Sequence, residues 1–286
     1  MTDARPLEAH IDTALGGNER PLYYFLCRVS GLPGTRINQG IVDAFAESCA
    51  ARGKSVDALL RRMASIHPDE APGGTVLEFV PVCATAAYGL RAASDPRAEA
   101  KLLPILHELA DDMRFRVRDA VPPALAAIGA RRGEALLEGV AGWMDGYFHA
   151  AAVLLALTRT EWLSQLNDGA LVATRLAEAF RLLDDAPRTA SRYPGYKALV
   201  DAIAVAPRAL AARFGVIIFD TLATLAVTKD PHLRELIGKS VSDRALQGRF
   251  ADDVRRVNAA IAAATPAPRD PSRIVKGMRR RGKRDR

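Results

Sequence analysis

The chain has 286 residues, of which 49% are hydrophobic and only 6% are aromatic. Such a chain can bury a large core of closely packed helices, and its three widely spaced cysteines exclude a small disulfide-stabilised domain. It has no run of 18 or more uncharged apolar residues and no apolar segment near its N-terminus, so we expect neither a membrane-spanning helix nor a secretory signal.

The formal net charge of +7 is concentrated at the C-terminus. Residues 265–286 contain nine Lys or Arg and two Asp, which leaves 31 of the 40 basic residues and 31 of the 33 acidic residues in residues 1–264. The charges of residues 1–264 therefore cancel. We expect a helical-repeat domain over residues 1–264, with no strongly basic trough, and a basic, disordered tail over residues 265–286.

Apolar residues at helical spacing predict four helices in the first third of the chain, over residues 6–15, 21–30, 36–52 and 55–66. Gly16 and Gly17 end the first helix, and residues 31–34 (GLPG) separate the second from the third. Ser55 is the predicted N-cap of the fourth helix. Residues 67–74 are polar and rich in turn residues, which predicts a surface loop.

Residues 95–157 are predicted to form two consecutive helix–turn–helix units. A helix over residues 76–90, bent or started near Pro81, precedes them. Their helices are expected over residues 98–110, 114–129, 133–144 and 147–158. The residues predicted to face inward from the helix over 114–129 are Phe115, Val117, Val121, Leu125 and Ile128.

The two units resemble one another in sequence. A shift of 33 or 34 residues superposes Leu102, Leu103, Leu106 and Phe115 on Leu136, Leu137, Val140 and Phe148. Self-similarity at this period is typical of a helical solenoid, in which no hairpin buries its apolar face alone.

The last third of the chain continues the helical pattern. Helices are expected over residues 161–166, 171–183, 196–205, 207–227 and 250–264, and Asp230-Pro231 opens a further helix. The apolar run at residues 216–219 lies inside a longer segment of helical period, which favours a buried helix over a strand. The sequence thus predicts an all-α protein of about fourteen helices in about seven hairpins.

Two segments resemble HEAT repeats of the armadillo-like superfamily: residues 115–121 (FRVRDAV), after an acidic turn, and residues 230–235 (DPHLRE). The resemblance covers residues 95–157 and 198–241. It implies that Asp112 and Asp230 lie in the turns, that a turn Asp caps the second helix, and that Arg118 and Arg234 pair with acidic turn residues. The segment after His149 lacks this arginine.

This resemblance implies a right-handed HEAT-like α-solenoid. Members of the family are mostly scaffolds that bind partner proteins along a curved surface. A minority bind nucleic acid, and one branch excises alkylated bases from DNA.

No catalytic motif stands out in the sequence. Two Gly-Lys-Ser triplets, beginning at Gly53 and Gly238, lack the earlier glycine of a phosphate-binding loop, since Ser48 and Leu233 occupy its place. The histidines show no ligand spacing with one another or with cysteine, so we expect no metal site and no cofactor. Histidines at the core edge or surface are expected instead: His10, His67, His107, His149 and His232.

The alternative function is excision of alkylated bases, which needs a carboxylate near a cationic sugar and aromatic faces around the lesion. Those residue types gather at Trp143, Asp145, Tyr147 and Trp162, near Arg159. Against this alternative, Trp143 and Asp145 are two residues apart and should not share a helix face. Because the charges of residues 1–264 cancel, the folded part also offers little electrostatic attraction to phosphates. Packing between repeats explains both tryptophans more simply.

The basic tail is the strongest local signal in the sequence. It predicts salt-sensitive contact with a polyanion, either DNA or RNA, an acidic protein surface or anionic lipid, and it has no aromatic residue to stack on bases. A disordered solubilising extension explains the same composition equally well. The candidate polyanion-binding residues are Arg273, Lys276, Arg279, Arg280, Arg281, Lys283, Arg284 and Arg286.

From the sequence we therefore expect a cytoplasmic, non-enzymatic scaffold. Its concave face, formed by the second helix of each hairpin, would bind a protein partner, and the tail would add a nonspecific tether. Cys27, Cys49 and Cys83 are expected to be small buried apolar residues in a reducing compartment.

Overall fold

A computed structural model describes residues 5–266 of the chain, and within this range all regular secondary structure is helical. The prediction of an all-α protein is confirmed. The α-helices are α1 (Arg5–Leu15), α2 (Arg20–Val29), α3 (Gln39–Arg52), α4 (Asp57–Ala64), α5 (Phe79–Ser94), α6 (Pro96–Ala110), α7 (Phe115–Asp119), α8 (Val121–Arg132), α9 (Glu134–Gly139), α10 (Tyr147–Leu157), α11 (Thr160–Leu163), α12 (Gly169–Asp184), α13 (Pro194–Phe214), α14 (Val216–Leu225), α15 (Pro231–Ser240), α16 (Arg244–Arg249) and α17 (Ala251–Ala264). Short 3₁₀ helices are η1 (Gly53–Val56), η2 (Val76–Glu78), η3 (Ala141–Asp145) and η4 (Arg188–Arg192).

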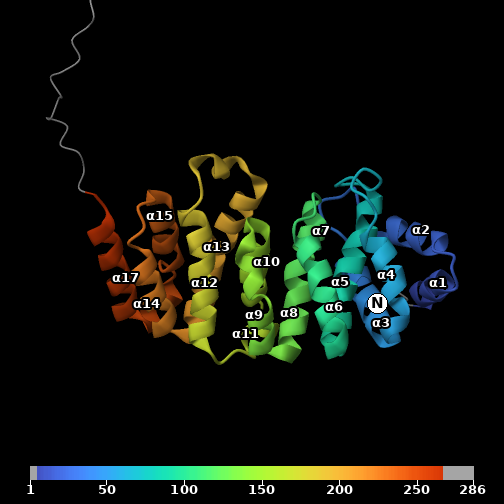
Figure 1. The fold of residues 1–286 in the computed structure, drawn as a ribbon, viewed down its shortest axis with the longest axis horizontal. Helices are drawn as coiled ribbons and strands as arrows, with labels where there is room; N and C mark the ends of the chain where they lie inside the picture. The colour runs from blue at the N-terminus through green and yellow to red at the C-terminus, as the bar shows by residue number, and fades with distance from the viewer. Residues whose placement is uncertain (1–4, 267–286) are drawn as a thin grey trace, which may run out of the picture.

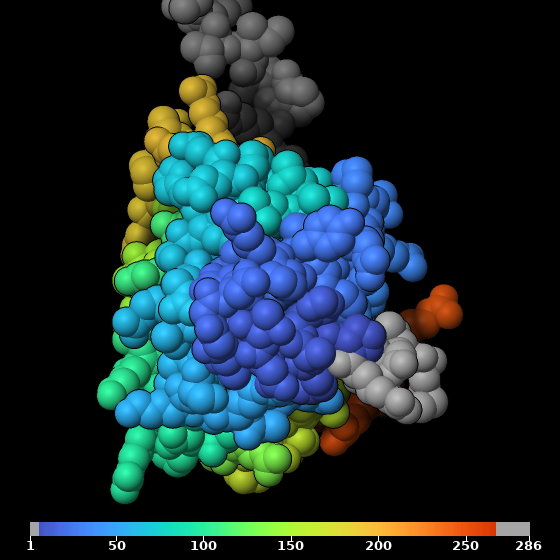
Figure 2. All heavy atoms as spheres, turned by 90° about the vertical axis from the view of Figure 1, so that its right-hand side faces the viewer, coloured from blue at the N-terminus to red at the C-terminus, as the bar shows by residue number. Residues whose placement is uncertain are grey.

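The helices follow one another along the long axis of the molecule in chain order (Figure 1). Helices α3, α5, α8, α10, α13 and α15 form a row in which each helix contacts the next. Helices α4, α6, α9, α12, α14 and α17 each pack against a member of this row. At the N-terminal end, α1 and α2 cover the end of the row (Figure 2). One continuous hydrophobic core extends from α1 to α17.

Three glycines in the same backbone conformation join a helix of the row to the helix that follows it. Gly53, Gly133 and Gly215 have φ angles of 59°, 54° and 59°, a region that strongly favours glycine. They end α3, α8 and α13, and the next helical segment starts without an intervening loop. A glycine with a positive φ angle thus connects two consecutive helices at three places along the chain.

The predicted helix over residues 114–129 is divided into α7 and α8. Pro122 and Pro123 lack the N–H groups that would bond to the carbonyls of Arg118 and Asp119, so the helix is interrupted at Ala120. Phe115, at the start of α7, is 50% exposed, and the prediction that it faces inward is wrong. The other residues predicted to face inward are buried: Val117, Val121, Leu125 and Ile128.

Other boundaries also differ from the sequence prediction. Ser55 is not an N-cap, because its hydroxyl donates to the Arg52 carbonyl within a 3₁₀ turn and α4 begins at Asp57. Helix α13 continues through Pro207, where a break was predicted, because Ile203 and Leu210 on either side are buried in the core. Residues 216–219 are helical, as predicted, but they begin α14, because Gly215 divides the helix that was predicted over residues 207–227.

Helix α5 is the central helix of the N-terminal half. Together with η2 it is long and apolar enough to cross a membrane by length and composition, although it contains the charged residues Glu78 and Arg91, and 72% of its apolar window is buried inside the protein. Its contacts with α3, α4, α6 and α8 are those of a core helix. Two charged residues at its ends are neutralised, Glu78 by Arg116 and Arg91 by Asp57 and Asp95.

The cysteines pack as apolar residues, as predicted. Cys49 and Cys83 are buried and Cys27 is half-buried, and all three are free thiols. Burial raises the pKa of Cys49 to about 12 and also raises the pKa of Cys83, so neither thiol is a ready nucleophile.

Helices α5 and α8 approach each other so closely at Gly89 that no side chain fits there. A Cβ atom at Gly89 would lie 2.5 Å from the Cα atom of Ala124. We predict that Gly89→Ala lowers the free energy of unfolding by about 1–3 kcal/mol, because the two backbones must move apart. Urea denaturation followed by circular dichroism measures this change.

The matched control is Gly139→Ala on α9, where an added Cβ meets nothing within 4 Å. This variant is expected to be neutral or slightly stabilised, since alanine favours helix more than glycine does. Equal stability of Gly89→Ala and the wild type would contradict the close approach.

Candidate functional site

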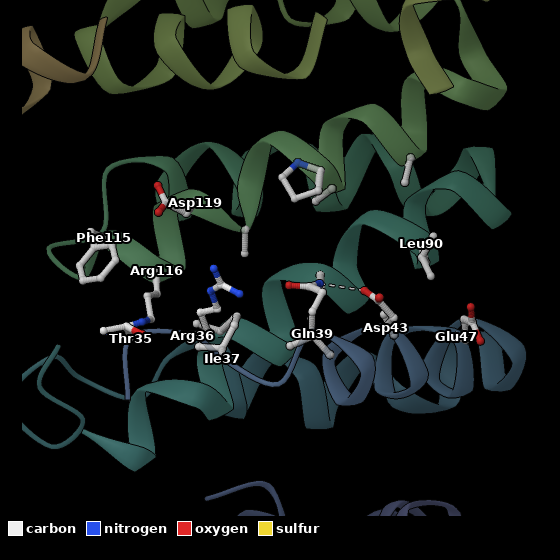
Figure 3. Close-up of a pocket in the computed structure, with 18 residues that line it drawn as sticks. Thr35, Arg36, Ile37, Gln39, Asp43, Glu47, Leu90, Phe115, Arg116 and Asp119 are labelled. Carbon is white, nitrogen blue, oxygen red and sulfur yellow. Dashed lines mark hydrogen bonds between the residues drawn. The ribbon is translucent and has the colours of Figure 1, made fainter. Parts of the chain in front are cut away.

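One cavity of the described part lies between α3 on one side and α7 and α8 on the other, with α5 as its floor (Figure 3). We name it the α3–α8 groove, and it has a volume of about 550 Å³. Small side chains leave this space open where the three helices meet. Its apolar lining includes Val42, Ala46, Val82, Ala86, Ala124 and Ala127.

One end of the groove is basic and aromatic, and the other end is acidic. Figure 3 shows Arg36 and Arg116 near Phe115, and Asp43 and Glu47 toward the opposite end. The Arg116 guanidinium lies 4.4 Å from the centre of the Phe115 ring. This cation–π contact fixes an exposed aromatic ring at the basic end of the groove.

Arg116 is already neutralised by the protein. Its Nη1 lies 3.0 Å from Oε2 of Glu78, a fully buried carboxylate that also accepts the backbone N–H of Gly74 at 2.7 Å. The other charged side chains in the lining form no salt bridge with a described residue: Arg36, Asp43, Glu47 and Asp119. The unpaired charge of the groove is therefore net negative.

Asp119 ends α7 and lines the groove without a hydrogen-bond partner among residues 5–266. Partial removal of its carboxyl group from water raises its pKa, against the opposing effect of Arg118 and Arg116. The surroundings of Asp119 thus make its ionisation less favourable than in water.

A second cluster joins His107 of α6, Asp145 of η3 and His149 of α10. The Asp145 carboxylate lies 3.2 Å from Nε2 of His107 and 2.8 Å from Nδ1 of His149. The two imidazole rings stack with their centres 3.6 Å apart. Partial burial pushes the pKa of Asp145 up, but hydrogen bonds from His149 and His107 outweigh it and hold that pKa below its usual range.

Trp143 and Asp145 were not expected to share a helix face, but both reach the same neighbour. Both belong to a 3₁₀ helix and both contact His107, the Trp143 ring edge-on with 5.1 Å between ring centres. The sequence signal for this cluster is the spacing of four between Asp145 and His149, which places them on one side of a helical turn.

The other residues considered for base excision are occupied in structural contacts. Trp162 is fully buried and its indole N–H donates to the Gly133 carbonyl at 3.1 Å, as expected for packing. Tyr147 packs edge-on against Tyr196, and Arg159 pairs with Glu161. No open aromatic cage therefore forms among these side chains.

The two HEAT-like arginines make equivalent contacts. Arg118 donates to the Asp112 carbonyl and Arg234 to the Thr228 carbonyl, in each case six residues earlier in the chain. They were expected to pair with acidic turn residues: Arg118 contacts Asp112 through its backbone carbonyl, whereas the partner of Arg234 is Thr228. Asp112 pairs with Arg114, and Asp230 accepts a backbone N–H at the start of α15.

The eight candidate polyanion-binding residues, Arg273 to Arg286, lie outside the described residues, and their role stays a prediction. No family model, curated protein or solved structure matches this chain.

We predict that Asp119→Asn stabilises the protein at pH 7. The pKa of Asp119 is higher in the folded protein than in the unfolded protein, so this group favours folding at low pH. The stabilisation is lost as the pH rises through the pKa of the unfolded state and then through that of the folded state. Because the group is partly exposed, we expect an increase in Tm of only about 1–2 °C. Thermal unfolding at pH 7 and pH 4 measures this effect, which should shrink at pH 4.

Asp43→Asn, on the opposite wall of the groove, is the control for loss of one negative charge. The Asp43 carboxylate accepts a hydrogen bond from the Gln39 amide at 2.8 Å, so its removal should not stabilise the protein. A lower Tm for Asp119→Asn than for the wild type at pH 7 would contradict the assignment.

Proposed function

We propose that this chain is a cytoplasmic, non-enzymatic scaffold that binds a segment of a partner protein in the α3–α8 groove. The observation that carries the proposal is a groove with an apolar floor and carboxylates that no described residue neutralises. Grooves of this kind commonly receive an amphipathic helix or an extended peptide. The basic tail adds a nonspecific tether to polyanions.

We propose further that the helices form a right-handed HEAT-like α-solenoid of about seven hairpins. Three repeated features support this arrangement: the glycine joints at Gly53, Gly133 and Gly215, the Asp-Pro helix openings, and the arginine contacts to the turn backbone. The groove would then lie on the face formed by one helix of each hairpin, where partners of such scaffolds bind.

The charge of the groove selects the chemistry of the partner. Asp43 and Glu47 at one end favour a Lys or Arg side chain, and the apolar floor favours aliphatic side chains between them and Phe115. The same carboxylates repel phosphates, which disfavours nucleic acid as the ligand of the groove. We therefore commit to a protein segment that is apolar along one side and basic at one end.

The alternative, base excision from alkylated DNA, receives less support. A lesion site needs open aromatic faces, whereas Trp143 and Trp162 are both buried. Asp145 is engaged by two histidines, so its carboxylate is not aimed at an open cavity for a nucleotide. We keep the scaffold as the proposed function.

Binding of synthetic peptides tests the chemistry of the groove. We predict that a helical peptide with Leu along one side and Lys beside it binds the full chain more tightly than the same peptide with Glu in place of Lys. Asp43→Asn and Glu47→Gln should each weaken binding about two- to fivefold, the range of a partly exposed ion pair. Fluorescence anisotropy of the labelled peptides measures both effects.

Glu138→Gln, at an exposed position on α9 outside the groove, removes the same charge and should leave the affinity unchanged. Equal affinity for the two peptides, or an equal loss in Glu138→Gln, would overturn the groove as the binding site.

The tail is tested in the full chain by the triple substitution Arg279→Gln, Arg280→Gln and Arg281→Gln. If these residues contact phosphates, the slope of log K against log salt for duplex DNA should become shallower by about 2–3, at about 0.9 per lost contact. A gel-shift series at several salt concentrations measures the slope. An unchanged slope would show that DNA binds to the helical part, contrary to the proposal.

A further inference from the structure

The cluster of His107, Asp145 and His149, which we name the His–Asp–His cluster, gathers three potential metal ligands that the proposed scaffold function does not use. Its members come from α6, η3 and α10, and contacts of α10 with both α6 and η3 bring them together. The cluster lies outside the α3–α8 groove.

The ligand atoms converge at the spacing that a single ion requires. One ligand atom from each residue can be chosen so that all three lie within 4.8 Å of one another. The carboxylate lies 2.8 Å from His149 Nδ1 and 3.2 Å from His107 Nε2. Ligands bound tetrahedrally to Zn²⁺ at 2.0–2.1 Å lie about 3.3 Å from one another, close to these distances, and the stacked rings would have to rotate to aim both lone pairs at one ion.

Hydrogen bonding alone does not satisfy the cluster. Nε2 of His149 is buried and has no hydrogen-bond partner in the described part of the chain. Nδ1 is the nitrogen of His149 that faces Asp145, so it is the atom that would bind an ion shared with Asp145 and His107. The proton of the neutral imidazole would then lie on Nε2.

We propose that His107, Asp145 and His149 bind one Zn²⁺ ion. Two imidazoles and one carboxylate suit zinc, whereas Ca²⁺ and Mg²⁺ prefer sites made of oxygen ligands. Three protein ligands leave a fourth position for water. The half-exposed side chain of Asp145 gives the ion a route from solvent.

Gly146 allows His149 to take its place in the cluster. A Cβ atom at residue 146 would lie 2.9 Å from Nδ1 of His149, so an alanine there would displace the imidazole ring. This glycine provides a variant that disturbs the site while keeping all three ligands. The ion would tie α6 to η3 across the 38 residues of chain between His107 and Asp145.

Zinc titration of the full-length, untagged chain tests the proposal. After removal of metals with a chelator, isothermal titration calorimetry with ZnCl₂ should give one site per chain. His107→Gln and Asp145→Asn should weaken binding about tenfold or more, and Gly146→Ala should also weaken it. Circular dichroism establishes that each variant is folded, and His107 is half-buried, so its replacement spares the core.

Two controls exclude other ligands. His67→Gln replaces an exposed histidine that lies beside a single carboxylate, and Cys27→Ser replaces the half-buried thiol. Both variants should bind Zn²⁺ as the wild type does. The proposal is overturned if the wild type takes up no Zn²⁺, or if folded His107→Gln and Asp145→Asn bind it with wild-type affinity.

Trp143 provides an independent readout that does not depend on affinity. Its ring packs against both histidines, whereas Trp162, the second tryptophan, is buried against α8 at Gly129. Cu²⁺, which binds such sites more tightly than Zn²⁺, should quench the Trp143 fluorescence. The quenching should be largely lost in Trp143→Phe, and quenching of equal size in that variant would place the ion elsewhere.

Discussion

The burial of α5 between α3 and α8 is the packing on which the N-terminal half depends. The helix is apolar on most of its surface, and at Gly89 the backbone of α8 comes too close for any side chain. A helix buried this deeply keeps charged groups only where they are neutralised, as Glu78 and Arg91 are. The small residues that permit the close approach also leave the α3–α8 groove open, so the cavity is a consequence of the packing.

Local sequence signals predicted the helices where no distant contact opposes them. The Asp-Pro openings at Asp95 and Asp230 do cap α6 and α15, whereas Gly215 ends α13 inside a segment, residues 207–227, that was predicted as one helix. The errors came from competition between local and tertiary effects. Pro122 and Pro123 interrupt a helix because two successive hydrogen bonds are lost, whereas Pro207 loses one bond in a helix held by buried neighbours on both sides.

The groove and the His–Asp–His cluster could not be derived from helical periodicity. Periodicity assigns a residue to a face of its own helix, but the groove brings Glu47 of α3 opposite Asp119 of α7, 72 residues later in the chain. In the cluster, the spacing between Asp145 and His149 was visible in the sequence. The approach of His107 depends on the contact between α6 and α10, and the placement of Trp143 depends on a 3₁₀ turn that periodicity does not predict.

The glycine joints restrict where this chain can change in length. Gly133 is both the C-cap of α8 and the N-cap of α9, so no loop residue separates the two helices. One residue inserted after it would rotate α9 by about 100° and turn Leu136 and Leu137 out of the core. Insertions should therefore be tolerated in the longer connections, at residues 67–74 and 185–193, and rejected at the three glycine corners.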